Sequence, residues 1–161
     1  MSIQLGDASQ AAVDTMEAQG FILWDRPELE VPHLPADLTS LDDEALMDLW
    51  SVLVAWSDYT NGQLSAAQVD ERSTERKLKF TESQLMVLKG AGSKASVTML
   101  KAEIAVSPAI EKLEEELDGL YAYRKMVESI AQNLERDSSL ISRELTRRTS
   151  GNQQRKGWTQ T

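Results

Sequence analysis

Apolar residues recur at three- and four-residue steps in two long stretches of the chain, the spacing that places side chains on one face of a helix. The first stretch begins at "TSLDDEALMDLW", where Ser40 and Asp43 fit a capping box at a helix N-terminus. The dipeptide Asn61–Gly62 predicts a kink or a short interruption, and "GAGSK" (90–94) predicts the turn that ends the helix. The apolar face of its first half consists of Leu46, Leu49, Leu53, Trp56 and Thr60.

The second stretch follows a short helix expected over 96–105. Ser107 and Pro108 suit the N-cap and the first position of a new helix, and nothing breaks its pattern until about Thr149. A helix over 108–149 would be about 60 Å long. Its steps of three and four form a heptad seam with polar intrusions at Arg124 and Ser138. The seam consists of Ile110, Leu113, Leu117, Leu120, Arg124, Val127, Ala131, Leu134, Ser138, Ile141 and Leu145.

These patterns predict an all-α fold, a long antiparallel helical hairpin or coiled coil over 40–149 with an extended, proline-rich N-terminal arm. A hairpin within one chain is the simpler interpretation. Polar residues in a seam often set register and copy number in coiled coils, which favours an oligomer. The residues expected to make that oligomer are Leu113, Leu117, Leu120, Arg124, Val127, Leu134, Ile141 and Leu145.

The acidic arm, residues 1–39, contains one short helix expected over 8–19, with a cap at Asp7 or Ser9 and an end at Gly20. Prolines at 27, 32 and 35 exclude a helix from the next stretch. That stretch nevertheless begins with the apolar run "FILW", residues 21–24. Two interpretations stay open: the arm folds back on its own helices, or it lies on a neighbouring subunit.

Charge is distributed unevenly along this chain of 161 residues, whose formal net charge is −9. Residues 1–60 contain many acids and the single base Arg26, whereas residues 72–101 and 136–161 are both basic. The acidic cluster "EKLEEELD" (111–118) separates the two basic zones. Such asymmetry is typical of a protein that acts by interaction with partners.

Few residues offer catalytic chemistry. The chain has no cysteine, and its single histidine, His33, lies in the proline-rich arm, where a solvated loop position is expected. Glu114, Glu115 and Glu116 are consecutive, so they radiate around the helix instead of converging. No phosphate-binding glycine motif is present. We therefore expect a protein that is not an enzyme, with no cofactor and no metal. With neither a signal peptide nor an apolar run of membrane-spanning length, it is expected to be soluble and cytoplasmic.

The basic zones suggest a nucleic-acid interface. Arginine near an aromatic side chain is the combination that grips the backbone of a single strand and stacks its bases. Phe80 follows the first basic cluster, and Trp158 lies in a basic tail expected to be flexible, residues 150–161. A solvated helix face is the alternative explanation for such stripes. The candidate DNA-binding residues are Arg76, Lys77, Lys79, Lys89, Lys94, Arg136, Arg143, Arg147, Arg148, Arg155, Lys156 and Trp158.

The stretch "SPAIEKLEEELDGLYAYRKMVESIAQNLERDSSLISRELTRR" resembles the C-terminal helix of the UvsY-like recombination mediators of phages. In that family an acidic, leucine-spaced segment leads to aromatic residues, here Tyr121 and Tyr123, and then to a basic ending. The family's preceding helix carries a basic pair implicated in binding single-stranded DNA, matched here by Lys77 and Lys79. The resemblance covers roughly residues 40–148 and does not include the N-terminal arm or the tail.

The resemblance implies a non-enzymatic mediator that forms homo-oligomers, binds single-stranded DNA and helps load a recombinase while a single-strand-binding protein is displaced. Such a protein works in the cytoplasm of the host cell. The alternative function is a structural or assembly protein of the virion, a helical head or neck component whose N-terminal arm contacts neighbouring subunits.

Overall fold

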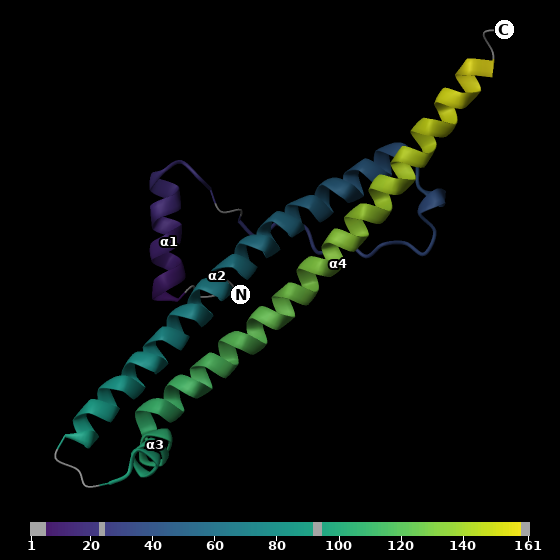
Figure 1. The fold of residues 1–161 in the computed structure, drawn as a ribbon. Helices are drawn as coiled ribbons and strands as arrows, with labels where there is room; N and C mark the ends of the chain where they lie inside the picture. Colours follow the sequence, from purple (N-terminus) through teal and green to yellow (C-terminus); the bar gives the residue numbers. More distant parts are fainter. Residues whose placement is uncertain (1–5, 23–24, 92–94, 159–161) are drawn as a thin grey trace. The chain divides into compact units, whose positions relative to one another are not determined.

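The computed structural model describes residues 6–22, 25–91 and 95–158, with side chains up to residue 150. The protein is all-α, as the sequence predicts, and no strand occurs in the ranges described. Figure 1 shows the order of the helices along the chain. They are α1 (Asp7–Ala18), the short 3-10 helix η1 (Leu38–Ser40), α2 (Asp43–Gly90), α3 (Val97–Ala105) and α4 (Pro108–Trp158).

The chain divides into two compact units. One comprises Met1–Ile22 and Leu64–Met126, and the other comprises Leu23–Gln63 and Val127–Thr161. In each unit a segment of α2 packs antiparallel against a segment of α4, which confirms the hairpin-like pairing of the two long helices. Among the described residues, no helix has both the length and the apolar character needed to cross a lipid bilayer.

The core of the second unit is built from the predicted apolar faces of the two long helices. Leu46, Leu53 and Trp56 of α2 are buried against Leu134 and Ile141 of α4. On each helix, most of these residues recur seven positions apart or at three-residue steps, so they lie on the same face. Burying their apolar surface supplies most of the free energy that holds this part of the hairpin together.

The proline-rich segment packs on the second unit of its own chain. The Trp56 indole Nε1 donates a hydrogen bond of 2.9 Å to the Leu29 carbonyl, and the Arg26 guanidinium lies 5.7 Å from the centroid of the Trp56 ring. Leu34 and Leu38 also pack against the core. Of the two interpretations of the arm, the structure therefore shows folding back for this segment.

The N-terminus of α2 differs from the predicted capping box. The Asp42 carboxylate accepts a hydrogen bond of 2.8 Å from the Ala45 N–H and so caps the helix. Ser40 is the last residue of η1, and its hydroxyl donates to the Asp37 carbonyl instead. The capping box of Ser40 with Asp43 is therefore wrong, because the turn of η1 moves the start of α2 by two residues.

Helix α2 is also continuous through Asn61 and Gly62, where the sequence predicts a kink or interruption. A glycine inside a helix costs only about 1 kcal/mol relative to alanine. Buried side chains on both sides, Thr60 and Ala67, hold the helix in register across this point. Packing therefore outweighs the local propensity.

The elements around the turn largely follow the predicted boundaries. Helix α2 ends at Gly90, Ser96 caps α3 by accepting a 3.3 Å hydrogen bond from the Met99 N–H, and α4 begins at Pro108. At its other end, α4 continues to Trp158, well beyond the predicted end near Thr149. Its last turns contain glutamine, arginine and lysine, which are good helix formers and offset the glycines at positions 151 and 157.

The short helix α1 begins at Asp7 and ends at Ala18, close to the predicted 8–19. Its N-cap is Gly6, and no side chain of its own segment caps it, so neither Asp7 nor Ser9 is the cap. After the helix, Gly20 has a φ of 86°, the left-handed conformation that favours glycine at a helix end.

Candidate nucleic-acid interface

The most concentrated run of exposed cations in the described residues lies on α2. Arg72, Arg76 and Lys79 occupy positions i, i+4 and i+7, which places them on one side of the helix over about 10 Å. All three are exposed. We call Arg72, Arg76 and Lys79 the α2 basic face. Of these residues, the candidates predicted from the sequence include Arg76 and Lys79 but not Arg72.

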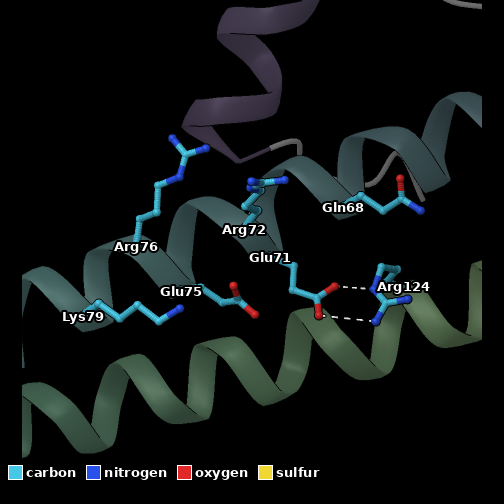
Figure 2. A pocket seen from close by; sticks show the side chains of 7 residues that line it. All are labelled: Gln68, Glu71, Arg72, Glu75, Arg76, Lys79 and Arg124. Atoms are coloured by element: carbon cyan, nitrogen blue, oxygen red, sulfur yellow. Dashed lines mark hydrogen bonds and ion pairs between the residues drawn. The ribbon is translucent and has the colours of Figure 1, made fainter.

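The α2 basic face borders an open hollow of about 470 Å³ in the first unit (Figure 2). Four cations and two carboxylates line the hollow, so its charge is positive in a protein that is acidic as a whole. The full lining is Gln68, Glu71, Arg72, Glu75, Arg76, Lys79 and Arg124.

One of the two carboxylates is engaged by a cation from α4. The Arg124 guanidinium donates two hydrogen bonds to Glu71, through Nε to Oε2 and through Nη2 to Oε1, the latter at 3.3 Å. Both side chains are largely buried, and Arg124 also lies 5.2 Å from the centroid of the Tyr121 ring. Glu71 therefore has its charge compensated, and Glu75 is the acid that remains against the basic face.

The three cations of the α2 basic face make no ion pair with another described residue, so no carboxylate has to be displaced before they contact a ligand. Phe80 follows them on the adjoining side of the helix with 64% of its surface exposed. An exposed phenylalanine beside unpaired cations offers a ring for stacking and charges for a phosphate backbone. Proteins that bind single-stranded nucleic acid commonly combine these two features.

Lys77 lies on a different side of α2 from the basic face. It borders a second hollow of about 300 Å³ together with Asp7, Asp70, Ser73 and Thr74. The basic pair that the resemblance matches to Lys77 and Lys79 is thus split between two hollows, because residues two apart on a helix point about 200° apart. The hollow beside Lys77 contains the acids Asp7 and Asp70, whereas the hollow beside Lys79 is lined mainly by cations.

The basic residues of α4 are mostly paired within the chain. The Glu144 carboxylate accepts hydrogen bonds of 2.7 and 2.8 Å from Arg147 and a bond of 2.8 Å from Arg148. Arg148 also donates to the Asp43 carboxylate at 2.9 Å and to the carbonyl oxygens of Leu38 and Thr39. Arg148 therefore ties α4 to the start of α2 in the second unit and is poorly available to a ligand.

Two other candidate cations also have a carboxylate partner. Arg136 pairs with Asp137 at 2.9 Å, and Lys89 pairs with Glu103 at 2.6 Å. Arg143 is exposed, has no such partner among the described residues, and borders a hollow that includes Trp50 and Ser138. Lys94 lies outside the described residues, as do the side chains of Arg155, Lys156 and Trp158.

The residues predicted to form an oligomer face other helices of the same chain. None of them is exposed in the described structure. In the first unit these are Leu113, Leu117, Leu120 and Arg124, and in the second unit they are Val127, Leu134, Ile141 and Leu145. The pairing of α4 with α2 in each unit accounts for their periodicity, and self-association through these residues stays a prediction.

The Glu144 cluster gives a prediction for acid stability. Hydrogen bonds from Arg147, then from Arg148, lower the pKa of Glu144 from 4.5 to about 2. A carboxyl whose pKa is lower in the folded state stabilises the protein above its ordinary pKa and loses that contribution as the pH falls towards 2. We expect Glu144→Gln to be less stable than the parent at pH 7, with the difference disappearing between pH 4.5 and 2.

Urea denaturation of both proteins at pH 7, 4 and 2.5 measures this difference in the free energy of unfolding. Other carboxyls titrate in the same range in both proteins, so only the difference between the two reports on Glu144. A difference that stays constant across the three pH values would contradict the assignment.

No family model, curated protein or solved structure matches this chain. The likeness to UvsY-like mediators therefore stays a prediction from the residues that carry it. The geometry of the α2 basic face is the observation on which a functional proposal has to stand.

Proposed function

We propose that this chain is a non-enzymatic accessory protein of phage recombination that binds single-stranded DNA through the α2 basic face. The observation that supports this proposal is the row of three unpaired cations beside the exposed ring of Phe80. In a chain of net charge −9, a local row of cations without carboxylate partners creates a positive potential on one face, which favours an anionic ligand there.

A single strand suits this face better than a duplex. The cations follow one helix face in a line, and Phe80 offers a ring that only an unpaired base is able to stack on. Among the described residues that line the hollow, Gln68 is the only uncharged polar one, so recognition is expected to depend on the backbone and on stacking, with little sequence preference.

The resemblance adds partners to the proposal: a recombinase, a single-strand-binding protein and further copies of this chain. Three cations per chain make a weak site. Several copies on one strand raise the effective concentration of each site and so convert weak contacts into firm binding. A protein that holds the strand in this way helps a recombinase to replace the single-strand-binding protein.

The structural alternative, a virion or assembly protein, depends on an N-terminal arm that reaches a neighbouring subunit. In the structure, the proline-rich segment contacts Trp56 and the core of its own chain. No contact among the described residues favours the alternative over DNA binding.

Titration of a fluorescently labelled oligo(dT) with the full-length protein, followed by anisotropy, tests the proposal. With three phosphates neutralised per chain, log K is expected to fall with log salt with a slope of about −2. Affinity is therefore expected to drop about 20-fold between 50 and 200 mM salt. A duplex of the same length should compete poorly. Absence of binding at 50 mM salt, or binding that is insensitive to salt, would contradict the proposal.

A further inference from the structure

The carboxylate of Asp70, on α2, holds the N-terminus of α1. It accepts hydrogen bonds from the Gly6 N–H at 3.0 Å, from the Ser9 N–H at 3.0 Å and from the Ser9 hydroxyl at 2.6 Å. The backbone N–H groups at the start of a helix have no partner within the helix itself. Asp70 thus acts as the cap of a helix that lacks a side-chain cap in its own segment.

This contact depends on the absence of a side chain at position 6. A Cβ atom on Gly6 would lie 2.7 Å from both Cγ and Oδ1 of Asp70, closer than real Cβ contacts come. Any larger residue at position 6 therefore requires the Asp70 carboxylate or the start of α1 to move, which disrupts the contact between them. The Asp70 contact is a clamp that a single substitution is able to open.

Little else attaches α1 to the first unit. Only Ser9 and Val13 are buried along its 12 residues. An isolated helix of this length is marginal in water, and a segment with few buried apolar contacts opens at low free-energy cost. The clamp at Asp70 is therefore a large part of what keeps α1 docked.

Docked α1 brings negative charge to the basic part of α2. It contains Asp7, Asp14 and Glu17 and no base. Asp7 and Lys77 border the same hollow, and Asp70 precedes Arg72 by two residues. Because neighbouring charges are incompletely screened at physiological salt, Asp7 opposes a phosphate backbone that approaches Lys77 on α2.

We infer that α1 is a detachable acidic cover, and that its docking on Asp70 opposes the binding of single-stranded DNA to α2. This inference rests on the proposed function. Release of α1 would remove Asp7 from beside Lys77, a side chain that is already exposed, and so favour contacts of Lys77 with a strand that binds Arg72, Arg76 and Lys79. By thermodynamic linkage, a strand bound to α2 must loosen α1 by the same factor by which α1 weakens the strand.

The test uses Gly6→Val in the full-length protein, because this substitution opens the clamp without a change in charge. We expect it to bind labelled oligo(dT) at least threefold more tightly than the parent at 50 mM salt. Hydrogen exchange of the α1 amides should be faster in the variant, and also in the parent when oligo(dT) is added. Ala12→Val is the matched control, since it adds bulk to an exposed position of α1 and should bind as the parent does.

Ser9→Ala is a second, charge-neutral variant that removes the 2.6 Å bond to Asp70 with little effect on folding. If the parent binds oligo(dT) but neither Gly6→Val nor Ser9→Ala binds more tightly, the cover is wrong and the proposed function stands. The cover is also wrong if the α1 amides exchange no faster in either variant than in the parent. If no protein of the set binds oligo(dT), both the cover and the proposed function are contradicted.

Discussion

Replacing Arg72, Arg76 and Lys79 together with glutamine is expected to weaken the binding of single-stranded DNA by about 20-fold or more at 50 mM salt. The three cations have no carboxylate partner among the described residues, so their removal takes away contacts with phosphates without leaving an acid that has lost its partner. The slope of log K against log salt should become shallower by about 2, since each neutralised phosphate contributes about 0.7 on a single strand. Anisotropy titrations at several salt concentrations measure both quantities.

Glutamine has a helix propensity close to that of the arginine and lysine it replaces, so α2 should stay folded in this variant. Circular dichroism and the midpoint of thermal unfolding check that. A folded variant that binds with the affinity and the salt slope of the parent would show that the α2 basic face is merely a solvated surface.

Leu53→Ala is expected to lower the free energy of unfolding by about 2–5 kcal/mol. Leu53 is completely buried in the cluster with Leu46, Trp56 and Ile141. Truncating it removes apolar surface from the core and leaves a cavity that the close-packed α2–α4 pair in this unit is poorly able to close. Urea denaturation at pH 7, followed by circular dichroism, measures the loss.

Leu88→Ala is the matched control, because the same chemical change is made at a side chain that is 73% exposed. The control should change stability by no more than about 0.5 kcal/mol. Equal losses for the two variants would contradict the position of Leu53 at the centre of the core.

The fold was predictable to the extent that side chains repeat with the period of a helix. The α2 face that includes Leu46, Leu53 and Trp56 and the α4 face that includes Leu134 and Ile141 are both buried as their spacing indicates. Periodicity indicates that one face of a helix is buried, but it does not indicate which helix packs against that face. The seam on α4 has the spacing of an intermolecular coiled coil, yet it faces α2 of the same chain.

The boundaries were harder to predict, because local signals compete with packing. Serine at position 40 is a residue type that favours a helix N-cap, but Ser40 belongs to η1, and Asp42 caps α2 instead. Gly62 has the sequence of a helix break, but buried neighbours hold α2 in register through it. In the first case the hydrogen bonds of η1 and of Asp42 outweigh the residue type at position 40, and in the second case packing outweighs the residue type at position 62.

The candidate site was only partly predictable. Arg72 continues the spacing of Arg76 and Lys79, so the sequence held a signal for it. The bonds from Arg147 and Arg148 to Glu144 also follow helical spacing. By contrast, the pair of Asp43 with Arg148 and the clamp of Asp70 on Gly6 join positions 105 and 64 residues apart, which no local pattern indicates.

The central claim is that the affinity for single-stranded DNA depends on the position of the cations on α2 and not on the total charge of the protein. It is tested most directly with a charge-matched variant in which Lys89, Arg136 and Arg147 are replaced by glutamine. These three cations have carboxylate partners within the chain, and the variant has the same net charge as the one altered at Arg72, Arg76 and Lys79. We predict that it binds oligo(dT) within about threefold of the parent, against a loss of about 20-fold or more for the α2 variant. Equal losses in the two variants would contradict the claim.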